Sequence, residues 1–274
     1  MSPLREVALL VERELVRNLR SAKGIVLAIL CVLGGTGTTM AGIATQKTYA
    51  KVSAEQVHQI REQALSATYG EEIGKYLAGA PEVMFGMMAG TIGLAALLAT
   101  MIGFDSISAE LQHRGVRYWT VRARRSSYIV GKFLGLFAVA SSMTLLMHAC
   151  SWVALGVKTD LSVATIASWG LRFWLLTLPV SAAWCAIVTF FSALFRTPIL
   201  ALLVSCVAWI ALGITFLVGK VGEHEALTWL YPNGLDRLLL SPSPDKLLMG
   251  VAAAVVWAAV FVAGGTVLFQ QRDV

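Results

Sequence analysis

The chain has 274 residues, of which 57% are hydrophobic and 14% are charged, and its formal net charge is +6. Together with a mean hydropathy of +0.72, this excludes an ordinary soluble domain, which could not cover so many apolar side chains with polar surface. The basic residues lie beside long apolar segments and not on a separate polar domain, so the charge does not indicate nucleic-acid binding. We expect an integral membrane protein.

Residues 1–23 place apolar side chains among arginines and glutamates, several of them at helical spacing. This pattern predicts an interfacial helix that lies on the membrane surface before the chain turns inward. An ordinary solvated lead-in is the alternative.

Six apolar segments follow, each long enough to cross about 30 Å of hydrocarbon as a helix. We predict an all-α, single transmembrane domain over residues 1–274, with transmembrane helices at 24–45, 83–104, 133–157, 173–195, 197–219 and 247–271. Helices are required because lipid offers no hydrogen-bond partner to an open backbone. Small residues in the first two spans, including Gly34, Gly35, Gly86 and Gly90, predict close helix packing, either inside the chain or between two copies.

The distribution of cations predicts the topology. Lysine and arginine are dense before the first span and between spans two and three, and sparser in the longer segments 46–82 and 220–246. The positive-inside rule therefore places both termini in the cytoplasm and these two segments outside.

The outer segments carry their own signals. Ser53 and Gln56 have the spacing of a capping box, which predicts a helix from Ser53 to Thr68 that breaks at Tyr69 and Gly70. Segment 220–246 is partly apolar and favours short helices that dip into the outer leaflet, with a solvated loop as the alternative.

The inner segment 105–132 is the densest group of cations in the chain. Glu110 and Arg114 are four residues apart, and Arg114, Arg117, Val121 and Arg125 follow at three- or four-residue steps, which predicts a short helix. Aromatic side chains beside guanidinium groups suit a socket for a protein partner. Topology-setting cations and attachment to anionic lipid are the competing explanations.

Other functions lack their usual residues. His148 is the one ionisable acid or base in the middle of a predicted span, and we expect it to be a hydrogen-bonded packing residue and not part of an ion-coupling site. The chain has no metal-ligand spacing, no Walker A loop and no nucleophile motif. We therefore expect no catalytic, cofactor-binding or metal-binding residues.

The chain resembles the membrane (permease) subunit of ATP-binding-cassette (ABC) transporters, type-2 exporter permease family. The likeness rests on the basic lead-in, on the large outer segment between spans five and six, and on the following inner pattern: Asp105 and Glu110, then Gly115-Val116, Arg125, and Gly131-Lys132.

This resemblance implies a pump whose ATP and Mg are bound by a separate cytoplasmic ATPase, in two copies, beneath this permease and a second copy or paralogue. It places the chain in the cell inner (plasma) membrane as a multi-pass protein. It makes 105–132 a coupling loop whose ATPase-contacting residues are Glu110, Arg114, Arg117, Tyr118, Trp119, Arg122 and Arg125, with Asp105 and Lys132 fixing its ends.

The expected function is export or flipping of a substrate. One alternative is a subunit of the same architecture that transmits force to an extracytoplasmic partner without moving a substrate. A lower alternative is a membrane scaffold or an intramembrane enzyme.

Overall fold

The computed structural model describes residues 2–49, 53–121, 123–222 and 224–272, and this part of the chain is helical without strands. Six helices are long and apolar enough to cross a membrane: α2 (Ala22–Tyr49), α5 (Glu82–Gly103), α8 (Arg125–Lys158), α9 (Val163–Leu194), α10 (Pro198–Val221) and α13 (Pro244–Gln270). The all-α, six-span prediction is confirmed.

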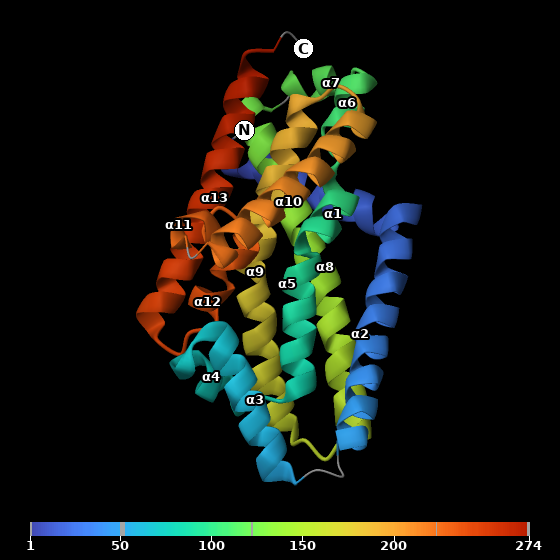
Figure 1. Ribbon diagram of the computed structural model, residues 1–274. Coiled ribbons are helices and arrows are strands. Elements are labelled where there is room, and N and C mark those ends of the chain that lie inside the picture. The colour runs from blue at the N-terminus through green and yellow to red at the C-terminus, as the bar shows by residue number, and fades with distance from the viewer. Residues whose placement is uncertain (1, 50–52, 122, 223, 273–274) are drawn as a thin grey trace.

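Two pairs of helices lie at opposite ends of the bundle. Helices α6 (Ser108–Gln112) and α7 (Val116–Thr120) lie at one end with the last turn of α13, here called the α6–α7 end. Helices α3 (Ala54–Tyr69) and α4 (Glu71–Ala78) lie at the opposite, α3–α4 end (Figure 1). Helix α1 (Pro3–Arg20) crosses the long helices near the α6–α7 end, and the chain turns into α2 at Ser21, whose backbone is extended.

Two long helices extend past the segments that hydropathy marks. Helix α8 has 34 residues, so it is about 50 Å long, and it begins at Arg125 where the sequence pattern favoured a loop up to residue 132. Helix α9 likewise begins at Val163, ahead of the predicted 173. Hydropathy locates the apolar part of a helix but does not locate its ends, because charged residues at a terminus are compatible with helical backbone.

Helix α9 is the centre of the bundle and packs against α5, α8 and α13. Its buried side includes Trp184 and Cys185. His148 of α8 is buried and lies 3.1 Å from the hydroxyl of Thr91 on α5, as expected for a hydrogen-bonded packing residue. By contrast, α10 buries few side chains and exposes a stripe of Leu, Ile and Val, which suits a helix facing lipid.

Gly35 lies where α2 approaches α8 closely enough to exclude a side chain. A Cβ at Gly35 would overlap the backbone carbonyl of Met147, so α2 and α8 are too close there for a side chain. One turn further on, the hydroxyl of Thr39 bonds that of Ser151 at 2.7 Å. The small residues Gly86 and Gly90 of α5 face open space within this chain.

Gly35→Ala is therefore expected to destabilise the protein by about 1–3 kcal/mol, because the helices must separate. Gly37→Ala, on the same helix but facing open space, is the matched control and should be neutral or slightly stabilising, since alanine is the better helix former. Thermal unfolding in detergent, followed by loss of the monodisperse chromatographic peak, compares the two. Equal midpoints would contradict the proposed contact.

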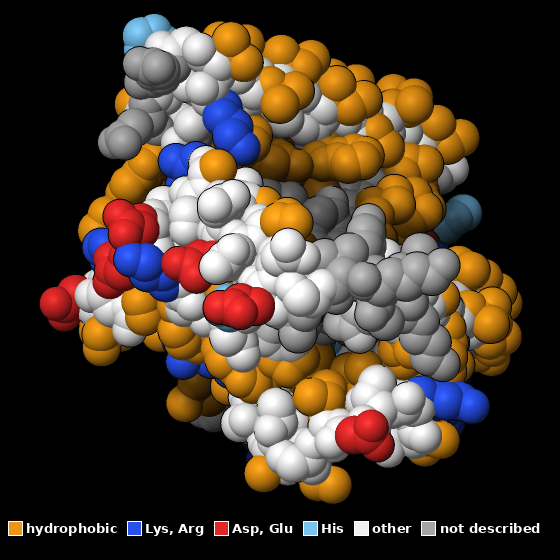
Figure 2. All heavy atoms as spheres, turned by 60° about the horizontal axis from the view of Figure 1, so that its bottom comes forward, with side chains coloured by type: hydrophobic (Ala, Val, Ile, Leu, Met, Phe, Trp, Pro, Cys, Tyr) orange, Lys and Arg blue, Asp and Glu red, His pale blue; other side chains and the backbone are white. Residues whose placement is uncertain are grey.

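The α3–α4 end is built largely as the sequence predicts. Ser53 accepts a hydrogen bond from the amide of Gln56, and Gly70 ends α3 with a φ of 95°, which favours glycine. Helix α4 was not predicted. Figure 2 shows this end turned toward the viewer, with acidic and basic side chains grouped beside apolar ones. Lys246 of α13 pairs with Glu72 of α4 at 2.8 Å.

Segment 220–246 contains short helices, as expected: α11 (Glu225–Thr228), the 3₁₀ helix η1 (Pro232–Leu235) and α12 (Asp236–Leu239). The side chain of Asn233 joins two spans, since its amide donates to the carbonyl of Ile92 at 2.9 Å and its oxygen accepts from the indole of Trp184 at 2.7 Å. Arg237 donates to the carbonyl of Thr68 at 3.0 Å. These bonds tie the segment to the core and to α3.

Asp236 makes stability depend on pH. Burial raises its pKa to about 6, although Arg237 and Lys220 act in the opposite direction; Tyr69 is the other titratable group that faces it. The folded state holds this proton more tightly than the unfolded state, so stability is highest below about pH 4 for this group and declines as pH rises to about 6.

Between pH 5 and pH 8 the wild-type protein should lose about 1 kcal/mol through this group. Asp236→Asn should remove that dependence and raise stability at pH 8 by about 1–3 kcal/mol. Glu6 does not confuse the measurement, since its pKa is lowered by hydrogen bonds from the Arg124 backbone and from Ser127, which keeps it ionised over this range. If Asp236→Asn keeps the wild-type pH dependence of the unfolding midpoint, Asp236 is not the group that causes this dependence.

Candidate functional site

Helix α1 buries a polar face. Glu6, Leu10, Glu14 and Asn18 follow one another at four-residue steps, all are buried, and this side packs against α8. The apolar side chains Leu4, Leu9, Val16 and Leu19 are instead exposed on the remaining surface. The sequence correctly predicts a helix here, and its exposed apolar side chains are compatible with an interfacial position, which stays a prediction.

Two glycines of α8 allow this packing. A Cβ at Gly131 would overlap the side chain of Leu10, and one at Gly135 would overlap that of Glu14. Because Gly131 and Gly135 are four residues apart, they lie on one face of α8 and form a shallow track for α1. The Gly131-Lys132 pair of the sequence pattern therefore has a steric explanation: the glycine brings α1 close enough for its carboxylate to reach the neighbouring lysine.

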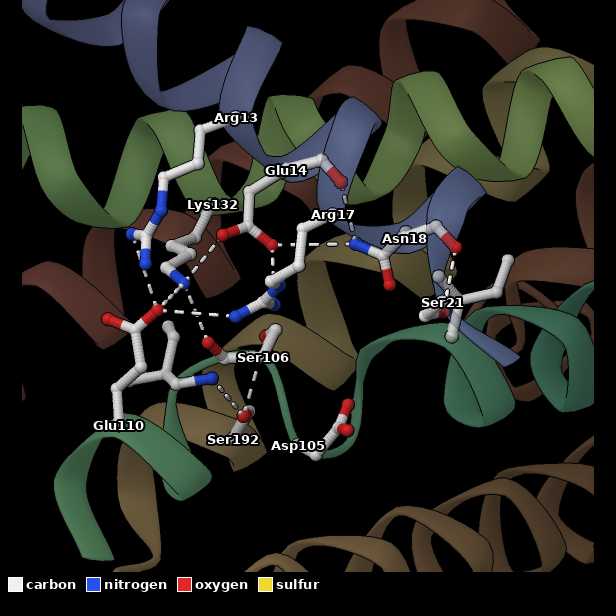
Figure 3. Close-up of polar contacts among 12 residues, drawn as sticks. Arg13, Glu14, Arg17, Asn18, Ser21, Asp105, Ser106, Glu110, Lys132 and Ser192 are labelled. Carbon is white, nitrogen blue, oxygen red and sulfur yellow. Dashed lines mark hydrogen bonds and ion pairs between the residues drawn. The ribbon is translucent and has the colours of Figure 1, made fainter. Parts of the chain in front are cut away.

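Lys132 is the centre of the site (Figure 3). Its side chain is fully buried, and its Nζ donates to Oε1 of Glu14 at 2.7 Å, to Oε1 of Glu110 at 2.6 Å and to the backbone carbonyl of Ser106 at 2.8 Å. An ammonium group has three protons to donate, so Lys132 is fully satisfied. Its bonds join α8 to α1 and to the segment that leads into α6.

Two arginines of α1 complete the arrangement. Arg17 pairs with Glu14 at 2.6 Å and with Glu110 at 3.3 Å, while Arg13 lies 3.6 Å from Glu110. We call Arg13, Glu14, Arg17, Glu110 and Lys132 the ion cluster. It holds two carboxylates and three cations, and the second oxygen of Glu110 also accepts from the hydroxyl of Tyr128 at 2.8 Å.

The α6–α7 segment is fixed at its start by α9. The hydroxyl of Ser192 accepts from the amides of Ile107 and Ser108 at 3.0 and 3.1 Å and donates to the carbonyl of Phe104 at 3.0 Å. Ile107 and Val116 are buried in a small apolar cluster with Leu10. A displacement of α6 would therefore strain its contacts with α1, α8 and α9.

Segment 105–132 contains two short helices, and the helical spacing that the sequence shows from Glu110 to Arg125 is interrupted between them. Helix α6 ends at Gln112, Arg114 has a φ of 56°, and α7 spans only Val116–Thr120 before α8 begins at Arg125. A left-handed residue cannot continue a right-handed helix. Glu110 consequently pairs with Lys132 and not with Arg114.

The predicted contact residues fall into two groups. Arg114, Arg117 and Tyr118 are exposed on the surface of the α6–α7 end, Tyr118 by 51%. Glu110 is turned into the ion cluster, and the ring of Trp119 lies 3.9 Å beneath the guanidinium of Arg13.

Two of the remaining predicted residues, Arg125 and Asp105, bond to other helices. Arg125 donates to the carbonyls of Gln270 and Arg272 at 2.8 and 3.0 Å and so caps α13. Asp105, predicted to fix a loop end with Lys132, pairs with Lys23 at 2.7 Å. Arg122 lies outside the described residues.

Sequence reasoning missed the residues of α1. Glu6 accepts from the amide of Arg124 at 3.1 Å at the start of α8, and this bond is the first cause of the lowered pKa of Glu6. The four-residue spacing of Glu6, Leu10, Glu14 and Asn18 is visible in the sequence, but it indicates a packed face only when a partner helix with a matching cation is known.

The site joins α6 to α1 and α8 through charged side chains. In the described part of the chain, no group of three His, Cys, Asp or Glu side chains is placed to hold a metal ion. Each carboxylate of the ion cluster is paired with more than one cation.

Comparison with known proteins gives one informative result. A family model described as ABC-2 family transporter protein matches residues 8–274. No curated protein is significantly similar to this chain. The match begins inside α1 and includes the ion cluster and all six long helices.

Proposed function

Because the chain belongs to the ABC-2 family of transporter proteins, and is thus the multi-pass permease subunit of an ABC transporter, we propose that it couples ATP hydrolysis by a separate ATPase to export or flipping of a substrate. Membership of the family implies an ABC ATPase partner. The observation that carries the proposal is the ion cluster, which connects the exposed α6–α7 segment to α1 and α8.

In this proposal the α6–α7 end faces the cytoplasm and receives the ATPase. Arg114, Arg117 and Tyr118 supply the contact surface, since they are exposed and combine guanidinium groups with an aromatic ring. Arg122 remains a candidate from the sequence. Glu110 contacts Arg17 and Trp119 contacts Arg13, so these two side chains hold the α6–α7 segment against α1.

Force would then follow the bonds already described. Displacement of α6 pulls on Lys132 and Glu14, and so on α8 and α1, while Ser192 passes it to α9. Such a path is stiff because Lys132 and Glu14 are buried and each is held by more than one partner. Two permeases and two ATPases would complete the pump, and ATP and Mg would be bound by the ATPases.

Force transmission to an outer partner is the second candidate. The bond of Arg237 to Thr68 connects α12 to α3, and that of Lys246 to Glu72 connects the start of α13 to α4. A displacement of the spans would therefore move the α3–α4 end as well, which suits a subunit that works on an extracytoplasmic protein.

Affinity purification in mild detergent followed by an ATPase assay tests the proposal. We expect an ATP-hydrolysing subunit to accompany the protein. Its absence under conditions that preserve other complexes of this type would contradict the proposal. Cross-linking from Ile60, which is exposed on α3, separates the two candidates, because only force transmission requires an outer protein to be captured there.

A further inference from the structure

Four arginines from separate segments line one pocket at the α6–α7 end. Arg114 and Arg117 come from the α6–α7 segment, Arg196 from the turn between α9 and α10, and Arg272 from the residues after α13. The pocket has a volume of about 390 Å³, and Leu111 and Val116 supply apolar wall. Among the described residues that line it, none is acidic.

Arg272 is built into this pocket. One nitrogen of its guanidinium donates to the carbonyl of Leu194 at the end of α9, whereas Nη1 is shielded from solvent and has no hydrogen-bond partner. Burial, and secondarily the nearby charge of Arg196, lowers the pKa of Arg272. An anion in the pocket would reduce the repulsion between the arginines that line it.

The pocket lies at the foot of a lipid-facing helix. Helix α10 begins at Pro198, directly after the pocket residues Arg196 and Thr197. Ile199 is 70% exposed, and Leu200 and Leu203 are exposed as well. Where an apolar exposed surface begins immediately beside a group of cations, the boundary between acyl chains and headgroups is expected.

We propose that this pocket binds the phosphate group of an anionic phospholipid, with the acyl chains lying along α10. The planar fork of arginine matches the oxygens of a phosphate. The position beside Ile199 favours a lipid over a carboxylate of the ATPase, which would approach from the exposed surface of α7. The inference is independent of whether the chain moves a substrate.

The full-length protein, purified with any subunit that accompanies it, is given equal amounts of phosphatidylglycerol and phosphatidylcholine with identical acyl chains. Retained lipids are counted by native mass spectrometry. We expect the wild-type protein to retain phosphatidylglycerol at least about tenfold better, because hydrogen bonds between charged groups are strong. Arg196→Glu and Arg272→Ala should each abolish that preference.

Arg20→Glu is the matched control, since Arg20 is exposed near the same end but does not line the pocket, and it should keep the preference. Arg196→Glu guards against a folding defect in Arg272→Ala, because Arg196 is exposed. The proposal is overturned if both pocket variants retain phosphatidylglycerol as the wild type does, if inorganic phosphate is retained in place of lipid, or if the variants lose the ATPase and keep the lipid.

Discussion

Lys132→Ala is expected to lower the free energy of unfolding by about 3–5 kcal/mol, because it leaves buried carboxylates without their shared cation. Glu14 is 2% exposed and Lys132 is fully buried, so water cannot replace the lost ammonium. Arg17 still reaches both Glu14 and Glu110, but the backbone carbonyl of Ser106 loses its bond from Lys132. Thermal unfolding of the purified protein in detergent measures the loss.

Lys23→Ala is the matched control for this experiment. Lys23 also pairs with an acid at the same end, Asp105 at 2.7 Å, but about a third of each side chain is exposed. Removal of this partly exposed pair, with the bond from Lys23 to the carbonyl of Ile102 at 3.0 Å, should cost about 1 kcal/mol. If Lys132→Ala and Lys23→Ala lower the unfolding midpoint equally, the buried ion cluster stabilises the fold no more than the Lys23–Asp105 pair does.

Arg117→Glu combined with Tyr118→Ala is expected to reduce ATPase activity supported by the complex at least about tenfold, because a reversed charge at a contact costs several kcal/mol of binding. Stability should remain close to that of the wild type, since both side chains are exposed. The readouts are the amount of ATPase that co-purifies, its rate of ATP hydrolysis and the unfolding midpoint.

Lys158→Glu reverses a charge at the opposite end of α8 and should leave the ATPase unaffected. Arg125→Glu, at another of the contact residues that the resemblance implies, addresses a different property: Arg125 caps α13, so its reversal should lower stability. Full association and activity in the Arg117 and Tyr118 variant would remove these side chains from the proposed contact.

The sequence predicts the fold well because each span is a local property. A run of apolar residues bounded by charge is sufficient to identify α5 or α10, and Ser53 with Gln56 is sufficient to place the start of α3. The short helices of segment 220–246 were likewise visible as breaks and apolar groups. None of these inferences requires knowledge of which helices touch.

The site could be predicted only in part, because its contacts join residues far apart in the chain. Glu14 and Lys132 are separated by 118 residues, and Arg17 and Glu110 by 93. Regular spacing suggested a pair between Glu110 and Arg114, but the left-handed backbone of Arg114 ends the helix and the buried Lys132 offers a better partner. The position of a polar, helix-containing segment between the second and third spans is predicted by the sequence, whereas the direction of each side chain is set by tertiary packing.

The central claim is that the exposed α6–α7 surface docks an ATPase, and cross-linking from Tyr118 tests it most directly. A photoreactive phenylalanine analogue at position 118 is irradiated in intact membranes, and the captured protein is identified by mass spectrometry. We expect a polypeptide with a Walker A phosphate loop, captured from position 118 and not from Ile60 at the other end. Failure to capture the ATPase from position 118, while it is present in the same membranes and bound to the protein, would contradict the account.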